Sequence, residues 1–179
     1  MTIIAAAGRR IDAPDASPPR FPLANRDAVR ERVRATLIEH EATGIVASGA
    51  CGADLLVQEV VRELDLSCRR MILPFAPDTF RQSSVADRPG DWGPLFDVLL
   101  AELAARGDVV TLAEDPGGDA AYAAVNRVIL AEAGRIAGVS TPLVLLIWDG
   151  ISRGEGDLTA DLGIIARERS WPIAEVLTV

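Results

Sequence analysis

Short, almost unbroken apolar runs alternate with segments of helical periodicity along the chain, and this alternation constrains the fold more than any other feature. Six runs have the length and composition of buried β-strands: residues 2–7, 45–48, 70–73, 108–112, 143–148 and 173–177. Five segments have the apolar spacing of helices: 25–40, 53–64, 92–105, 120–137 and 158–167. Strands that are apolar on both faces and alternate with helices are typical of a parallel sheet covered on both sides. The sequence therefore predicts a single α/β domain over residues 1–179, doubly wound, mostly parallel and Rossmann-like.

The charge balance of the chain restricts its partners. All 18 basic residues are arginine, and 26 acidic residues outnumber them, which gives a net charge of -8. An excess of negative charge opposes sequence-independent binding to nucleic acid. We therefore expect no nucleic-acid polymer as a partner, and we expect any bound nucleotide to be a small molecule in a local pocket.

Cysteine content and the N-terminal sequence predict a cytoplasmic protein. Cys51 and Cys68 are too few for a disulfide framework, and the first residues lack the basic segment and long apolar core of a signal peptide. No apolar run approaches the roughly 20 residues that cross a bilayer, so we expect no membrane partner. We also expect no metal ion and no resident cofactor.

The predicted sheet indicates where a ligand would bind. In a doubly wound sheet, ligands lie beyond the carboxyl ends of the strands, among the loops that lead into the helices. The loops at Gly8, Gly49, Pro74 and Gly150 follow predicted strands. These loops should therefore converge on one site.

The loop after the first strand combines a basic and an acidic side chain. Gly8 is followed by Arg9 and Arg10, and Asp12 comes two residues after them. A guanidinium such as that of Arg9 binds phosphate through two parallel hydrogen bonds, and the Asp12 carboxylate can accept a hydrogen bond from a ribose hydroxyl. A surface loop with an internal Arg–Asp pair explains the same residues equally well, so both interpretations stay open.

The loop after the second strand is a turn of small residues. Gly49 and Gly52 allow the backbone to approach a ligand closely, and Asp54 lies in the first turn of the helix that follows. Alternatively, the glycines permit tight packing of strand against helix, and Asp54 stabilises the helix dipole. For this motif taken alone, the structural explanation is the stronger one.

Further polar groups lie in the long loop over residues 75–90 and on the alanine-rich helix. Arg81 and Ser84 offer a guanidinium and a hydroxyl near Phe80, whose ring could stack on a base, although a flexible surface loop would contain the same residues. Asn126 lies inside a predicted helix, where an amide is out of place unless it faces a polar partner. Exposure of Asn126 to solvent is the simpler explanation.

The strongest pair of motifs follows the fifth predicted strand. The turn and the glycine loop after it contain Asp149, Gly150, Gly154, Gly156, Thr159 and Asp161. Unpaired backbone N–H groups and the helix macrodipole favour an anion at the start of the next helix, so we expect a phosphate there. In the alternative explanation, Thr159 caps the helix and Asp161 complements its dipole.

Taken in order, these motifs resemble the SLOG superfamily, which includes LOG-type phosphoribohydrolases, DprA-like proteins and nucleotide-sensing domains of bacterial conflict systems. The resemblance rests on segments spread over nearly the whole chain: residues 8–12, 48–54, 73–85 and 148–161. It implies a Rossmann-like domain that binds a nucleotide or a nucleotide-derived ligand. Relatives of this architecture often pair through helices, which implies a homodimer.

Two positions depart from the family's pattern. LOG-type hydrolases carry a Pro-Gly-Gly-x-Gly-Thr-x-x-Glu pattern whose glutamate takes part in cleaving the N-glycosidic bond. Aligning its threonine with Thr159 places Leu162 at the glutamate position. Asp161 points about 100 degrees away around the helix and is no simple substitute. Arg9 stands where a histidine is expected in similar relatives, which puts an imidazole's role there in doubt.

Three functions are consistent with the sequence, and the first is favoured. It is a sensor or carrier of a nucleotide derivative, with the phosphate on the 154–159 loop and the 49–52 turn and its charge held by Arg9 and Arg81. The carboxylates expected to contact the ribose are Asp12, Asp54 and Asp149. The second function is hydrolysis of a nucleotide N-glycosidic bond, with a carboxylate such as Asp54 or Asp149 at the reacting centre. The third is an interaction module with a vestigial pocket. The sequence identifies no catalytic residue.

Overall fold

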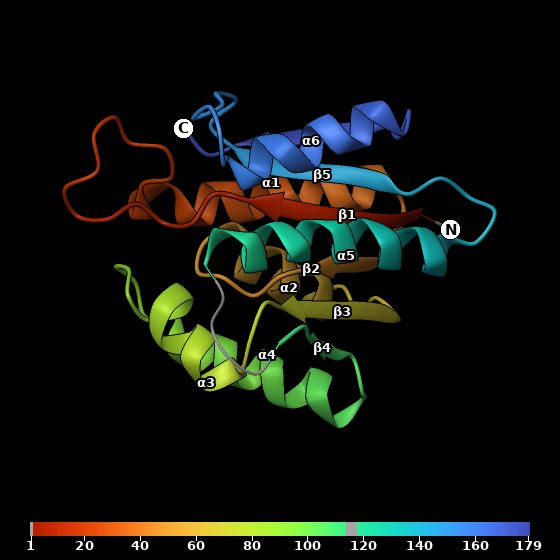
Figure 1. Ribbon diagram of the computed structural model, residues 1–179, viewed down its shortest axis with the longest axis horizontal. Coiled ribbons are helices and arrows are strands. Elements are labelled where there is room, and N and C mark those ends of the chain that lie inside the picture. The colour runs from red at the N-terminus through yellow and green to blue at the C-terminus, as the bar shows by residue number, and fades with distance from the viewer. Residues whose placement is uncertain (1, 114–117) are drawn as a thin grey trace.

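The computed structural model describes residues 2–113 and 118–179 and contains one six-stranded sheet in which all neighbouring strands are parallel (Figure 1). The strand order is β4-β3-β2-β1-β5-β6. The strands are β1 (Thr2–Gly8), β2 (Ala42–Ala47), β3 (Cys68–Leu73), β4 (Val109–Thr111), β5 (Leu143–Trp148) and β6 (Ile173–Leu177). Strand β1 is central, and its Ala5 is in register with Val46 on one side and Val144 on the other.

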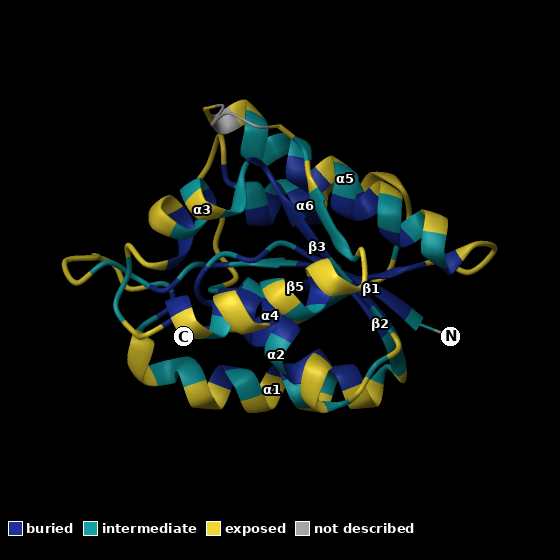
Figure 2. Ribbon diagram, turned by 90° about the horizontal axis from the view of Figure 1, so that it is seen from below, coloured by how far each residue is buried: buried dark blue, intermediate teal, exposed yellow. Residues whose placement is uncertain are grey.

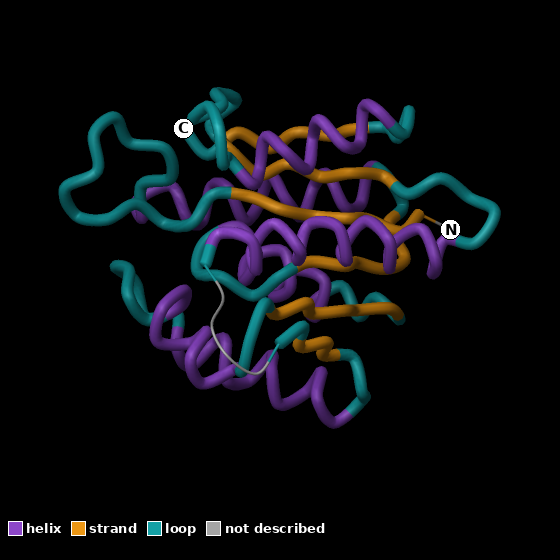
Figure 3. The backbone as a smooth tube through the Cα atoms, viewed as in Figure 1, coloured by secondary structure: helices purple, strands orange, loops and turns teal. Residues whose placement is uncertain are grey.

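Helices cover both faces of the sheet, as Figures 2 and 3 show. One face carries α1 (Arg26–Glu39), α2 (Ala53–Glu63) and α4 (Gly93–Ala105), and the opposite face carries α5 (Asp119–Ala137) and α6 (Leu158–Glu168). Between β3 and α4 lie the short helix α3 (Pro77–Phe80) and a π-helical turn (Arg81–Val85), and a 3-10 turn (Leu23–Asn25) precedes α1. The doubly wound, Rossmann-like prediction is confirmed.

Two apolar cores, one on each face, explain why the central strands β1 and β5 are apolar along nearly their whole length. In β1, Ile4 and Ala6 belong to the core under α1, α2 and α4, whereas Ile3 and Ala5 belong to the core under α5 and α6. This alternation is the two-residue period of a strand. Because both faces are buried, neither set of positions tolerates polar side chains.

The predicted strands and helices are all present, and the majority of their ends differ from the predicted ones by one to three residues. The main difference falls in residues 75–90, which we expected to be a polar loop. Pro77 starts α3, a position that suits proline because its missing N–H has no helical partner. Phe80, Ser84 and Val85 are buried, and this burial holds the segment in place.

The connections of β1 create a switch point at the carboxyl edge of the sheet. From β1 the chain proceeds through α1 to β2 on one side, whereas β5 and β6 lie on the other side. Helices on the two sides of such a point diverge and leave a crevice, which is where doubly wound proteins bind ligands. In the described ranges, no helix has both the length and the apolar character needed to cross a bilayer.

The turn between β2 and α2 requires glycine at position 52. Gly52 has a φ of 96°, and a Cβ there would lie 2.7 Å from both the Arg9 carbonyl oxygen and the Ile11 nitrogen. Gly107 also has a positive φ, of 71°, but its Cβ would meet nothing within 4 Å. The two glycines therefore share the backbone strain, and only Gly52 adds a clash with a neighbouring loop.

We expect Gly52→Ala to lower the free energy of unfolding by about 3 kcal/mol or more, since strain and overpacking combine there. Gly107→Ala should cost only about 1 kcal/mol, from strain alone. Urea denaturation of both variants measures the difference. Equal losses in the two variants would contradict the close approach of the Arg9–Ile11 segment to α2.

Candidate functional site

A cavity of about 550 Å³ lies beyond the carboxyl ends of β1 and β2. Its walls come from the loop after β1, the start of α2, the π-helical turn, α5 and the start of α6. The predicted site residues that line it are Gly8, Arg9, Asp12, Asp54, Ser84, Asn126 and Thr159. The cavity therefore gathers residues from five of the segments that sequence reasoning singled out.

The cavity is lined by both basic and apolar residues. Its basic lining residues are Arg9, Arg10, Arg20, Arg88 and Arg153, and its acidic ones are Asp12 and Asp54. Its apolar and aromatic wall includes Phe80, Tyr122, Val125 and Ile129. The five arginines also pair with the carboxylates of Asp87, Asp149 and Asp157. Guanidinium donors beside apolar side chains suit an anionic ligand with an apolar portion.

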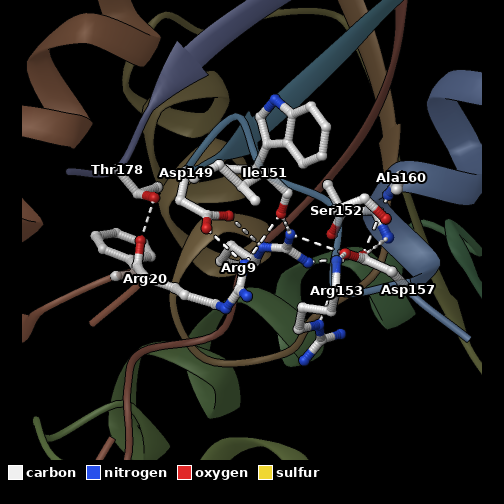
Figure 4. A network of polar contacts seen from close by, with 12 residues as sticks. Arg9, Arg20, Asp149, Ile151, Ser152, Arg153, Asp157, Ala160 and Thr178 are labelled. Atoms are coloured by element: carbon white, nitrogen blue, oxygen red, sulfur yellow. Dashed lines mark hydrogen bonds and ion pairs between the residues drawn. The ribbon is translucent and has the colours of Figure 1, made fainter. Parts of the chain in front are cut away.

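Arg9 is the centre of a buried ion-pair network (Figure 4). The residue is only 4% exposed. Its Nε donates to Asp149 Oδ1 at 2.8 Å, and Nη1 and Nη2 donate to the two carboxylate oxygens of Asp157 at 2.6 and 2.9 Å. Nη2 also donates to the Ile151 carbonyl at 2.7 Å. The network joins the loop after β1 to the loop between β5 and α6.

Asp157 is also the N-cap of α6. Its carboxylate accepts hydrogen bonds from the backbone N–H groups of Thr159 and Ala160, each at 3.2 Å, and from that of Arg153 at 2.7 Å. Burial by itself would raise the pKa of Asp157, but the hydrogen bonds from Arg9 and these amides outweigh burial and hold the pKa at about 2. The carboxylate is therefore ionised at neutral pH and occupies the position at the helix start where an anion is favoured.

This arrangement changes the roles predicted for Arg9 and Thr159. We expected Arg9 to hold the charge of a ligand and the start of α6 to bind its phosphate. In the structure, the Arg9 guanidinium and the first α6 amides are instead paired with Asp149 and Asp157. The alternative of a surface loop with an internal Arg–Asp pair does not describe Arg9 either, because Arg9 is buried and its two carboxylate partners lie in a distant loop.

Asp12 and Asp149 hold the loop after β1. Asp12 Oδ2 accepts the backbone N–H groups of Arg20 and Phe21 at 2.9 and 3.0 Å. Asp149 Oδ2 accepts from Arg20 Nη1 at 2.6 Å, while its other oxygen binds Arg9. Both carboxylates are therefore engaged by the protein itself, although Asp12 also lines the cavity.

Asp54 faces the cavity from the first turn of α2. Its Oδ2 accepts the Ala50 backbone N–H at 3.3 Å. Burial raises the pKa of Asp54 to about 7, against the opposing influence of the Ala50 amide and the positive charge of Arg10. A carboxyl group that gains and loses a proton near neutral pH can act as an acid or a base toward a bound molecule.

Eight of the predicted residues do not line this cavity: Gly49, Gly52, Arg81, Asp149, Gly150, Gly154, Gly156 and Asp161. Gly154 and Gly156 are exposed and do not line the cavity, whereas Leu158 and Thr159, which follow the same loop at the start of α6, do. Arg81 pairs with Asp97 of α4 through bonds of 2.7 and 2.8 Å. Asp161 borders a separate hollow of about 210 Å³ between α5 and α6. Arg81 therefore does not reach the ligand position that we expected it to share with Arg9.

Asn126 is not solvent-exposed, and the simpler explanation of this residue is wrong. It is 6% exposed, lines the cavity and donates from Nδ2 to the Leu158 carbonyl at 2.7 Å. The Leu158 carbonyl is the polar partner that an amide side chain inside a helix needs. It also attaches α5 to the first residue of α6.

Sequence reasoning missed several of the residues that define the cavity. Asp157 precedes a predicted helix and has the residue type that N-caps prefer, so its position was available as a signal. Tyr122 is the only tyrosine of the chain and lies in an otherwise alanine-rich stretch, which was a weaker signal. Arg88 carries no local feature that separates it from an exposed arginine, whereas Arg10 lies beside Arg9 in the loop that the sequence places at the ligand edge. Within the residues that the structure describes, no group of three or more His, Cys, Asp or Glu side chains could hold a metal ion.

Asp157→Ala should lower the free energy of unfolding by about 3 kcal/mol, since it removes the α6 cap and leaves Arg9 short of a buried partner. Sulfate should restore part of that loss, because the vacated position keeps two helix amides and a guanidinium. Urea denaturation with and without sulfate measures both effects.

Two controls accompany this measurement. Wild type in the same salt corrects for general salt stabilisation. Asp97→Ala breaks an exposed ion pair and should cost about 1 kcal/mol or less. A loss no larger in Asp157→Ala than in Asp97→Ala would contradict the central role of the network.

Asp54→Asn should stabilise the protein more at pH 8 than at pH 5. The pKa of Asp54 rises from 3.8 to about 7 on folding, so the folded protein binds this proton more tightly than the unfolded chain. Stability that comes from this proton is lost as the pH rises from about 4 to about 7. The asparagine variant has no such loss. Thermal unfolding of both proteins between pH 5 and 8 tests the sign, and a constant difference in Tm over this range would refute it.

Comparisons with known protein families, with curated proteins and with solved structures give no match for this chain. The resemblance to the SLOG superfamily therefore stays a prediction. The functional interpretation depends on the cavity, its arginines and its apolar wall.

Proposed function

We propose that the cavity binds a nucleotide or a nucleotide-derived small molecule, and that the protein senses or carries this ligand. The observation that supports the proposal best is the mixed lining, basic and apolar, of a cavity at the carboxyl edge of the sheet. A base needs an apolar or aromatic wall, and phosphate needs cationic hydrogen-bond donors. Both are present, and the cavity lies at the switch point where doubly wound sheets bind ligands.

The geometry favours a phosphate position near Arg10 and Arg88 over one at the start of α6. At α6 the first amides and Arg9 are already paired with Asp157. Arg10 and Arg88 both pair with Asp87, Arg88 at 3.6 Å. Two guanidinium groups that share one carboxylate keep a net positive charge, so a phosphate gains from binding there.

The base would then lie against Phe80, Tyr122 and Val125. These side chains line the cavity, and the rings of Phe80 and Tyr122 both pack edge-to-face against Phe75, with centroids 5.9 and 5.8 Å away. A wall fixed by such packing offers a base a surface that needs little rearrangement.

A SLOG-type assignment, a homodimer and a cytoplasmic location belong to the same proposal. The two cysteines are free, as is expected in a reducing compartment.

One observation favours a second candidate function, hydrolysis of a nucleotide N-glycosidic bond. The pKa of the cavity-lining Asp54 is raised to about 7, which suits a group that activates water. Against this candidate, Leu162 at the expected glutamate position is fully buried in the core under α6. Release of free base from a nucleoside monophosphate, abolished in Asp54→Asn, would establish the activity, and absence of release would leave binding alone.

The proposal is tested by thermal-shift measurements with AMP, GMP, CMP, UMP, NAD, ADP-ribose and cyclic nucleotides. A ligand that binds only the native state must raise its apparent stability. We expect at least one of these compounds to raise the Tm by several degrees. Absence of any shift would reject the proposed function and favour an interaction module.

For a compound that binds, Arg88→Gln should raise the Kd by about tenfold or more, because a charge-assisted hydrogen bond contributes about 1.5–3 kcal/mol. Arg81→Gln is the matched control, since Arg81 lies in the same segment but pairs with Asp97 outside the cavity. Calorimetric titration gives both constants. An equal effect of the two substitutions would place the phosphate elsewhere.

A further inference from the structure

Three hydroxyl groups in a row end at the aromatic wall of the cavity. Ser83 Oγ lies 3.0 Å from the Thr79 carbonyl oxygen, Ser84 Oγ lies 3.3 Å from Ser83 Oγ, and Tyr122 Oη lies 3.1 Å from Ser84 Oγ. Ser84 and Tyr122 line the cavity, whereas Ser83 does not. The row therefore connects an exposed helical carbonyl to the position proposed for the base.

Only one arrangement of the three protons satisfies all three contacts. Each hydroxyl has one proton to donate and two lone pairs that accept. The Thr79 carbonyl can only accept, so the Ser83 proton is committed to it. Ser84 must then donate to Ser83, and Tyr122 must donate to Ser84. The Tyr122 oxygen keeps its lone pairs but has no proton left for a ligand.

We infer that Tyr122 presents a hydrogen-bond acceptor to the bound molecule and selects a nucleobase that carries an amino group. This inference rests on the proposed function, because it concerns the base end of the same cavity. Phe80 and Val125 line the same cavity as Tyr122, so an acceptor that the ligand leaves without a donor shares the cavity with apolar side chains. An acceptor in such surroundings strongly disfavours a ligand that leaves it without a donor.

The surroundings of Ser84 and Tyr122 explain why the direction of the hydrogen bonds in this row is fixed. Ser84 is buried, and its carbonyl accepts the Cys51 backbone N–H at 3.0 Å, which attaches the π-helical turn to the start of α2. The Tyr122 ring is held edge-to-face against Phe75. Neither hydroxyl can turn away without leaving a hydrogen bond unmade. Ser83 is exposed, but its proton is donated to the Thr79 carbonyl. This donation sets the direction of the other two hydrogen bonds in the row.

The test compares nucleotides that differ only in the amino group: AMP with purine riboside monophosphate, GMP with IMP, and CMP with pyrimidin-2-one riboside monophosphate. For the pair that binds, wild type should prefer the amino-bearing member by about tenfold or more. Tyr122→Phe keeps the ring and removes the oxygen, so the ratio of the two Kd values should fall to about one.

Ser83→Ala gives a second test that does not touch the cavity wall. Without Ser83, the Ser84 proton can be donated to Tyr122, and the tyrosine proton becomes free to face the ligand. The preference for the amino group should therefore weaken at least threefold, although the substituted side chain contacts no ligand. Thr36→Val is the control, because Thr36 makes the same kind of bond to a helical carbonyl on α1, far from the cavity in sequence; it should leave the ratio unchanged.

The outcomes separate this inference from the proposed function. Equal binding of both members of each pair by wild type, or an undiminished preference in Tyr122→Phe or Ser83→Ala, would overturn the inference and leave nucleotide binding intact. If no nucleotide binds to wild type, the proposed function fails and the inference fails with it. Should Tyr122→Phe not fold, the surface substitution Ser83→Ala still decides the question.

Discussion

The pairing of Arg9 with Asp157 and Asp149 is the interaction on which the site depends. A guanidinium that is removed from water costs several kcal/mol unless good hydrogen bonds compensate for the lost solvation. Here two carboxylates and a carbonyl supply those bonds. The requirement to satisfy Arg9 keeps the β5–α6 loop against the loop after β1. The cavity then lies between that closed pair of loops and the apolar wall on α5.

Asp157 shows how a protein can use an anion site for its own structure. The start of α6 has the amides and the dipole that would attract a phosphate. A side chain of the same chain is already there, neutralised by a buried arginine. A glycine loop before a helix is therefore insufficient to locate a phosphate site, because the residue just before the helix decides whether that site is open.

Local patterns were enough to predict the strands, the helices and the edge of the sheet where the cavity lies. The alternation within β1 between Ile3 and Ile4 is a property of neighbouring residues, and the position of the site follows from parallel topology. The cavity's individual residues were less predictable, since they depend on partners far away in the sequence. Arg81 and Arg88 look alike locally, but Asp97 of α4 draws Arg81 away from the cavity. Tyr122 acquires its role from the π-helical turn, which no periodicity in residues 75–90 predicts.

The long sequence separation within the central network has a consequence for synthesis of the protein. Arg9 and Asp157 are 148 positions apart, so the ribosome makes all the residues between them before Arg9 can meet this partner. Strands β1, β2 and β3 are complete long before this, and they can pair while the guanidinium is still in water. The loop after β1 reaches its final form only when β5 and α6 have been made and added to the sheet. Nascent chains that stop short of α6 therefore contain most of the sheet and an unfinished cavity.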